Sequence, residues 1–124
     1  MKTKTIRIYP SDWELDIIIG GTKKQLENYS EQRYGLKDDP ITHNECNTIA
    51  SSKESELKGK TQFCICLKSL QNKGIVVHEI VHVIWHIGES IGYKIVYDSQ
   101  EWQAILFEYI FNEIVKADGY KEYV

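Results

Sequence analysis

A run of isoleucines and valines in the second half of the chain is interrupted at regular intervals by polar side chains. The interrupting residues include His78, Glu79, His82 and His86. Apolar residues recur between them every three or four positions, which predicts a helix over about residues 70–88 with one face buried in a core. Because the run is broken by polar residues and is too short to cross a bilayer, we expect no membrane partner.

The rest of the chain is expected to complete one α+β domain around this helix. The 124 residues are enough to bury one core, and 42% hydrophobic with 27% charged residues is typical of a globular protein. Within a single domain spanning residues 1–124, we expect residues 1–69 to form mainly a small mixed or antiparallel sheet with one surface helix, and residues 70–124 to form a helix pair. Periodicity and composition favour strands at residues 3–9, 15–19, 47–50 and 61–67. They favour further helices at residues 22–34 and 99–116.

Glycines and small polar residues mark the expected helix ends. Gly35 is positioned to end the polar surface helix, and both Gly88 and Gly92 are suited to ending the first helix of the C-terminal pair. Asp98 or Ser99 can cap the start of the second. A short connection is therefore expected between these two helices.

The charge and the cysteine content narrow the classes of partner and compartment. With 15 Lys and Arg against 18 Asp and Glu, the formal net charge is -3, so the chain lacks the broad basic surface that nucleic acids select. The three cysteines, Cys46, Cys64 and Cys66, cannot all pair within the chain, and reduced thiols are the simpler interpretation. The first ten residues lack the apolar segment of a secretory signal. A cytoplasmic protein that binds no nucleic acid is expected.

Residues 78–82 have the sequence His-Glu-Ile-Val-His, the HExxH pattern of many zinc hydrolases. Residues four apart lie roughly 6 Å along a helix on the same face, so the imidazoles of His78 and His82 can converge on one ion. Glu79 then projects beside the metal, where it can take a proton from the metal-bound water and pass it to the leaving amine. The alternative is that all three are satisfied polar residues of a mostly buried helix. Burying them without partners is costly, which favours a metal site.

A catalytic zinc site of this kind needs a third protein ligand, and Glu101 is the first candidate. The 18 residues between His82 and Glu101 are enough to finish one helix, turn and return antiparallel. Alternatively, Glu101 is the N3 residue of a capping box that begins at Asp98. Glu108, two turns further along the same face, is either a hydrogen-bond partner of a ligand histidine or the ligand itself. Glu89 is another candidate for the third ligand.

Four more residues are candidates for supporting roles. A straight helix places His86 about 12 Å from His78, too far for both to bind one ion, so His86 is expected to pack or to lie at the rim of the site. His43, Tyr93 and Tyr97 can donate a proton or stabilise a transition state if the fold brings them to the metal.

From residue 70 to residue 115 the chain resembles the gluzincin branch of the zinc metallopeptidases. The resemblance rests on the HExxH motif followed by Glu101 and Ala104 on a second helix. The short length and the sequence Gly-Ile-Val-Val-His-Glu at residues 74–79 resemble more closely compact zincin-like proteins of phage and prophage origin. Such an origin implies the cytoplasm of a bacterial host as the location.

The resemblance implies a minimal zincin-like domain with bound zinc, Glu79 as general base and Glu101 as third ligand. It also implies an edge strand beside the active-site helix that binds extended peptide, and residues 61–67 would occupy that place. The chain departs from the larger gluzincins at Ile105, where they commonly carry an acidic residue. It also has no histidine after His86, which sets the metzincins aside.

Two functions from different classes follow from these observations. The first is a zinc-dependent metallopeptidase that binds one zinc ion per chain and cleaves a peptide bond in a peptide or protein substrate. The alternative is a zincin-fold module that binds a protein without cutting it, because Trp13, Trp85, Trp102 and eight tyrosines exceed what a small core needs. The intact Glu79 favours the enzyme, and the oligomeric state stays open.

Overall fold

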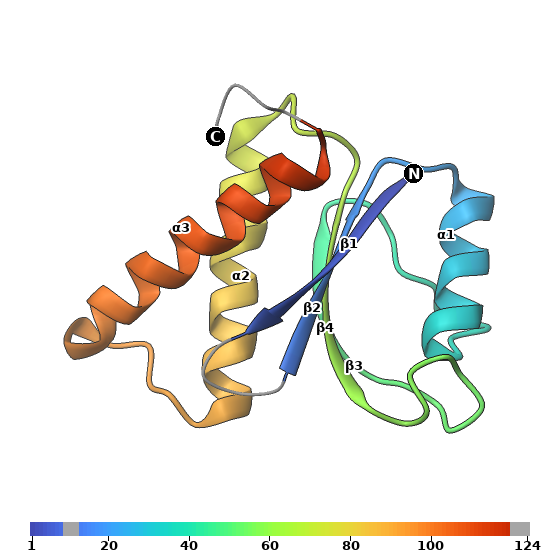
Figure 1. Cartoon of the computed structure of the whole chain (residues 1–124), viewed down its shortest axis with the longest axis horizontal. Coiled ribbons are helices and arrows are strands. Elements are labelled where there is room, and N and C mark those ends of the chain that lie inside the picture. Colours follow the sequence, from blue (N-terminus) through green and yellow to red (C-terminus); the bar gives the residue numbers. More distant parts are fainter. Residues whose placement is uncertain (9–12, 120–124) are drawn as a thin grey trace.

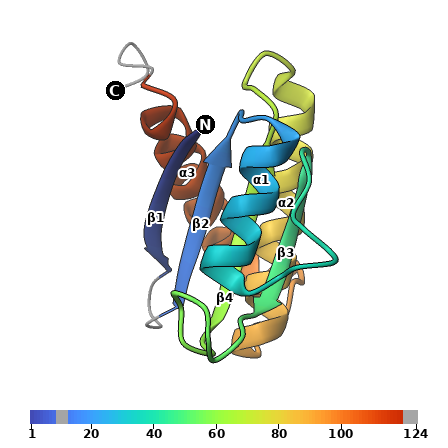
Figure 2. The same cartoon turned by 90° about the vertical axis from the view of Figure 1, so that its right-hand side faces the viewer.

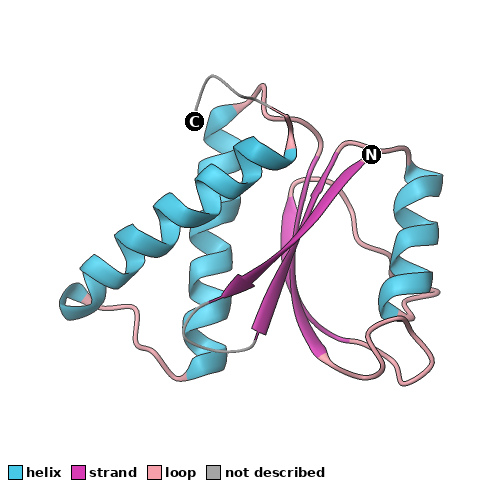
Figure 3. Cartoon of the chain, in the orientation of Figure 1, coloured by secondary structure: helices cyan, strands magenta, loops and turns pink. Residues whose placement is uncertain are grey.

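The computed structural model describes residues 1–8 and 13–119, which form a four-stranded mixed sheet with helices on both faces (Figures 1 and 3). The strands are β1 (Lys2–Ile8), β2 (Trp13–Ile19), β3 (Glu45–Ala50) and β4 (Thr61–Leu67). The helices are α1 (Lys23–Tyr29), which a π-helical turn at Ser30–Tyr34 continues, α2 (Lys73–Ile91) and α3 (Gln100–Ala117), which follows a 3₁₀ turn at Tyr97–Ser99. The predicted α+β class is confirmed, while Tyr9, the end of the first predicted strand, lies outside the described residues. Within the described ranges, no helix has both the length and the apolar composition that a membrane span requires.

The strand order in the sheet is β1-β2-β4-β3. β1 and β2 form an antiparallel pair, β4 runs parallel to β2, and β3 runs antiparallel to β4. Ile65 of β4 is therefore paired with Ile17 on one side and with Cys46 on the other. The edge strand expected at residues 61–67 is an interior strand, and that prediction is wrong. Almost every residue of β4 is buried, as in strands covered on both faces, and the more polar β3 occupies the edge.

The sheet separates two hydrophobic cores. α1 lies on one face and α2 and α3 lie on the other, so that they flank the strands on opposite sides in Figure 1, while in Figure 2 α1 lies in front of the sheet and α2 and α3 lie behind it. On β4, Phe63, Ile65 and Leu67 point into the core beneath α2 and α3, whereas Cys64 and Cys66 point toward α1. All three cysteines are free, which confirms the expectation of unpaired thiols.

Helix α2 begins and ends at residues with recognisable caps. The side chain of Asn72 accepts a hydrogen bond from the backbone N–H of Ile75, and Gly92 adopts a left-handed conformation with φ of 74° at the other end. The expectation that Gly88 can end this helix is wrong. Gly88 lies buried within α2, where a Cβ atom would stand 2.8 Å from the Cδ1 of Ile95 and 2.9 Å from the carbonyl oxygen of Tyr93. Its small size permits close packing of the segment that follows the helix.

The start of α3 is not stabilised by the capping box of Asp98 and Glu101, which was the alternative to a ligand role for Glu101. Ser99 occupies the cap position, but its side chain does not cap the backbone of the first turn, and within α3 it accepts only from the side-chain amide of Gln103, at 3.0 Å. Instead its hydroxyl donates to the carbonyl of Lys94 at 2.6 Å and accepts from the N–H of Val96 at 3.1 Å. Ser99 therefore folds the connection between α2 and α3, and Glu101 has no capping role.

A buried ion pair fastens the α1 side of the protein to the sheet. Asp16 on β2 is 1% exposed and accepts two hydrogen bonds from the guanidinium of Arg33, at 2.6 and 2.9 Å. The hydroxyls of Tyr34 and Thr5 also donate to it, each at 2.6 Å. Four donated bonds compensate the burial of the carboxylate, which would otherwise be strongly destabilising.

Candidate metal centre

Helix α2 carries the two histidines of its HExxH motif on the side that faces away from the core. Val76, Ile80 and Ile87 are at most 3% exposed and pack against the sheet. His78 and His82 lie about half a turn around the helix from these residues and are exposed to solvent. The helical period that buries the isoleucines therefore also presents both imidazoles at the surface.

The two imidazoles stand close together, one turn apart. Their Nε2 atoms are 3.1 Å apart, and the ring centroids are 4.7 Å apart with the planes inclined at 71°. The carboxylate of Glu79 completes a group of three ligand atoms that all lie within 4.8 Å of one another. Folding thus brings together the three residues that were predicted from the HExxH motif.

The spacing of the two imidazoles fits a zinc ion. Two nitrogens that bind one zinc at about 2.1 Å in a tetrahedral arrangement lie roughly 3.4 Å apart, close to the observed separation of His78 and His82. Imidazole nitrogen and carboxylate oxygen are both common zinc ligands. The same separation also suits a hydrogen bond between two neutral imidazoles. Because the two imidazoles already stand at this spacing, they could hold an ion with little rearrangement of α2.

Glu79 differs from the histidines because it is buried. It is 5% exposed, and its carboxylate forms no hydrogen bond or ion pair with the other described residues. It lies on the flank of α2 that faces the edge strand β3, close enough for its charge to affect the pKa of the Cys46 thiol. Burial raises the pKa of Cys46 to about 12, and the carboxylates of Glu79 and Glu45 add to the shift. The carboxylate oxygens of Glu79 nevertheless reach solvent, since they are not among the buried side-chain atoms that lack a hydrogen-bond partner.

The structure does not bring Glu101 to the metal group, contrary to its expected role as third ligand. The reason is the antiparallel return of α3, which places its first turn at the C-terminal end of α2. Tyr93, just after α2, stacks on Trp102 with ring centroids 4.6 Å apart and holds the start of α3 there. His78 lies in the N-terminal half of α2 and His82 at its middle, so Glu101 and the motif are separated along the helix axis. Figure 1 shows α3 starting well apart from the middle of α2.

The other candidate residues are also outside the group of three. Glu108 is exposed on α3 and Glu89 is exposed near the end of α2, where it lines the same shallow surface as His82 and His86. The Nδ1 of His86 lies 3.2 Å from the Oγ1 of Thr48 on β3, in agreement with a packing role at the rim.

The remaining three candidates make contacts elsewhere. The Nε2 of His43 is 3.0 Å from the carbonyl oxygen of Gly20, at the end of β2. Tyr93 is engaged with Trp102, and Tyr97 is 80% exposed to solvent. None of these side chains belongs to the metal group in the described part of the chain.

Two features beside the group were not anticipated. Cys46 and Thr48 alternate along β3 and so face α2 together, next to Glu79 and His86. On the opposite flank, Val77, Val81 and Trp85 are 42%, 44% and 55% exposed. The sequence shows that these three residues are spaced four apart, but it does not distinguish an exposed apolar stripe from a buried one.

Comparison with known proteins identified no protein similar to this chain. No protein-family model, curated protein or solved structure matches the chain.

Proposed function

We propose that this protein is a zinc-dependent hydrolase of the metallopeptidase type, in which His78 and His82 bind the ion and Glu79 is the general base. The observation that carries the proposal is the group of three ligand atoms within 4.8 Å on α2. The intact glutamate between the two histidines supports hydrolysis over metal storage, because a base beside the ion has no role in storage. The substrate class that we propose is a peptide or protein.

Each residue of the group has a distinct part in this proposal. The imidazoles of His78 and His82 hold the ion at the surface, where a polypeptide chain has access. Zinc in such a site lowers the pKa of a bound water and polarises a carbonyl group. The carboxylate of Glu79 stands within 4.8 Å of both imidazoles and accepts the proton that hydrolysis releases. Its burial beside Cys46 of β3 would hold the carboxylate close to an ion bound by the two imidazoles.

The test compares wild type with Glu79→Gln. Both proteins are loaded with zinc and incubated with a library of unstructured peptides, and products are identified by mass spectrometry. We expect the variant to keep its zinc and to lose cleavage by about 100-fold or more. Glu89→Gln, which changes an exposed carboxylate on the same helix, is the matched control and should cleave as wild type does. Cleavage by Glu79→Gln at the wild-type rate would contradict the proposed role.

A second candidate function is supported by the exposed apolar ridge of Val77, Val81 and Trp85. Val81 and Trp85, together with Ala104 and Phe107 of α3, border a groove of about 380 Å³ between the two helices. An exposed apolar patch of this kind is typical of protein-binding sites, so a module that binds protein without cutting it is the alternative. Under this alternative no peptide in the library is cut, and Trp85→Glu abolishes the retention of peptides by the zinc-loaded protein.

A further inference from the structure

The groove between α2 and α3 presents an apolar surface to solvent. It is lined by the side chains of Val81, Ile84, Trp85, Gln103, Ala104 and Phe107. Of these residues only Gln103 is polar, and its amide already donates to the hydroxyl of Ser99 at 3.0 Å and to the carbonyl of Val96 at 3.1 Å. The lining therefore offers a partner mainly hydrophobic contact.

The α2 wall of this groove is the exposed ridge of Val77, Val81 and Trp85. Ile84 forms part of the floor and is 4% exposed, whereas Trp85 is 55% exposed. Contact with a partner would remove the ridge from water, which is favourable for apolar surface. Tryptophan is also among the residues that most often anchor protein interfaces. The groove and its ridge therefore have the character of an interaction surface.

The α3 wall of the groove is bordered by two glutamates. Glu101 and Glu108 lie three residues before and four residues after Ala104, so the three side chains share one face of α3. Both glutamates are exposed, and neither forms a salt bridge with a residue in the described part of the chain. Glu89, one turn beyond Trp85 on α2, has the same charge. Residues 74–91 of α2 and residues 100–115 of α3 contain no lysine or arginine.

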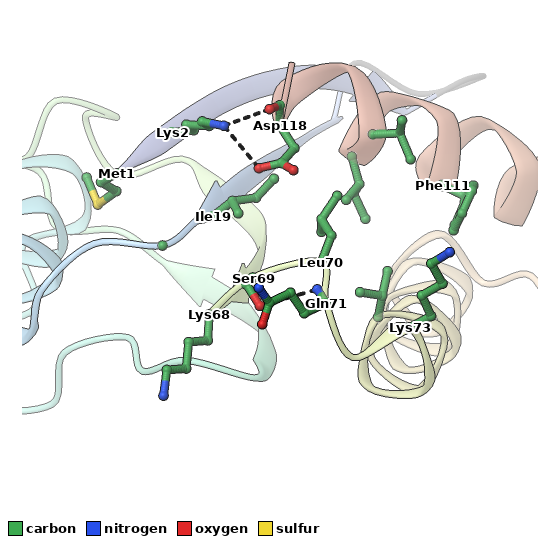
Figure 4. Close-up of a pocket in the computed structure, with 14 residues that line it drawn as sticks. Met1, Lys2, Ile19, Lys68, Ser69, Leu70, Gln71, Lys73, Phe111 and Asp118 are labelled. Carbon is green, nitrogen blue, oxygen red and sulfur yellow. Dashed lines mark hydrogen bonds and ion pairs between the residues drawn. The ribbon is translucent and has the colours of Figure 1, made fainter. Parts of the chain in front are cut away.

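The acidic residues at the other end of α3 are compensated by β1. The ammonium of Lys2 donates to the backbone carbonyl of Asp118 at 2.7 Å and pairs with its carboxylate at 3.2 Å (Figure 4). Lys4 pairs with Glu113 at 2.6 Å. The uncompensated negative charge of α3 is therefore concentrated at Glu101 and Glu108, beside the groove.

This charge favours a basic partner over a second copy of the chain. A two-fold contact over the groove would bring the acidic borders of both copies into one interface, where like charges oppose association. Lysine or arginine side chains placed beside Glu101 and Glu108 would instead gain favourable charge contacts. Charge complementarity thus indicates what kind of segment covers the apolar surface.

We propose that this groove binds a basic segment of a partner protein, with a large apolar side chain between Trp85 and Phe107 and lysine or arginine side chains beside Glu101 and Glu108. The apolar lining supplies most of the affinity, and the two glutamates select positive charge. Glu101 and Glu108, which the structure places away from the metal group, thereby have a role in recognition. The proposal does not depend on bound zinc or on hydrolytic activity.

Fluorescence anisotropy with three labelled peptides tests both parts of the proposal. The first peptide consists of leucine, lysine and glycine, the second has glutamate in place of each lysine, and the third has glycine in place of each leucine. The protein carries Glu79→Gln and is loaded with zinc, so that no peptide is cut. We expect saturable binding of the first peptide that weakens as the salt concentration rises, and binding of the other two that is weaker by about tenfold or more. No saturable binding of the first peptide, or equal affinity for the lysine and glutamate peptides, would overturn the assignment.

Surface variants of the same protein separate the acidic border from the apolar lining. Glu101→Lys combined with Glu108→Lys should remove the preference for the lysine peptide and leave the zinc content unchanged. Glu31→Lys combined with Glu54→Lys, two exposed sites in the turn after α1 and in the loop between β3 and β4, is the charge-matched control and should keep the preference. Equal losses in both double variants would show that net charge alone attracts the peptide and would contradict the role of Glu101 and Glu108.

Ala104→Trp, at an exposed lining position, should fill the groove and weaken binding of the lysine peptide by about tenfold or more. Unchanged melting temperatures show that the variants fold. Sedimentation equilibrium shows whether the chain associates with itself, and we expect a monomer in the absence of peptide. A dimer that Ala104→Trp disrupts would identify a second copy as the occupant and overturn the proposal.

Discussion

The Oγ1 of Thr48 lies 3.2 Å from the Nδ1 of His86, and this contact joins the edge strand β3 to helix α2 one turn beyond His82. His86 therefore helps to hold β3 against α2, beside Glu79. The donor depends on the tautomer of the imidazole, and either tautomer of a neutral ring satisfies both groups.

His86→Ala should therefore leave zinc binding intact and lower stability by a small amount. We expect Thr48→Val and His86→Ala to be coupled by about 0.5–1 kcal/mol in a double-mutant cycle measured by chemical denaturation, because both groups are partly solvated. Zinc content, measured on the same samples, should stay at the wild-type value. Loss of the metal from His86→Ala would identify His86 as a ligand and contradict this assignment.

The buried pair of Asp16 and Arg33 should matter far more to stability than the exposed pair that the same arginine makes. Asp16→Asn should lower the free energy of unfolding by about 3 kcal/mol, since it leaves a guanidinium and two hydroxyls around a neutral amide. Glu56→Gln is the matched control, because Glu56 accepts from Arg33 at 2.7 Å with a side chain that is 63% exposed. It should cost less than about 1 kcal/mol. Urea denaturation measures both, and equal losses would argue against the central role of Asp16.

Gly88→Ala tests the close packing of the segment after α2. Alanine is the better helix former, so propensity alone predicts a gain in stability. The structure predicts a loss of about 1–3 kcal/mol, because the added Cβ meets Ile95 and the backbone of Tyr93 at less than 3 Å. Thermal unfolding monitored by circular dichroism distinguishes these results, and a raised melting temperature would be incompatible with the close approach seen at Gly88.

Stability should fall as the pH rises through the alkaline range. Burial raises the pKa of Cys66 from 9.0 to about 12, and it raises the pKa of Cys64 as well. Between these values the unfolded chain has lost its thiol protons while the folded chain keeps them. Stability is therefore fully present below about pH 9 and declines toward pH 12, by at most about 1.4 kcal/mol per pH unit for each buried thiol.

The matched variant for this titration is Cys64→Ala with Cys66→Ala. It should be less stable than wild type at pH 7, because both side chains fill the core beneath α1. The difference between the two proteins should narrow as the pH rises, since only the wild type loses the contribution of these thiols. A difference that stays constant from pH 8 to pH 11 would contradict the buried, protonated state of the thiols.

Much of the secondary structure was predictable because local patterns determine it. The alternation of β1, the apolar run in β2 and the helical period of α2 each predicted an element, and Gly35 and Gly92 end helices where expected. The motif at His78 and His82 needed only the geometry of a helix to bring its side chains together. These features depend on residues within one or two turns of each other.

The errors concern relations between distant segments. The sequence of β4 does not state that β3 and β2 pair on either side of it, so its interior position depends on the whole sheet. Glu101 was assigned from the length of the connection, which does not reveal where along α2 the returning helix begins. Gly88 was expected at a helix end because glycine commonly ends helices. The close contact with Ile95, which accounts for a glycine inside α2, exists only in the folded chain.

The central claim, that α2 binds zinc through His78 and His82, is tested most directly by the zinc content of the purified protein. Wild type, His82→Ala and Glu101→Ala are each supplied with zinc, dialysed and analysed for metal per chain. We predict about one zinc in wild type and in Glu101→Ala, and none in His82→Ala. Absence of zinc from the wild type, or equal zinc in wild type and His82→Ala, would contradict the metal site and the hydrolase proposed from it.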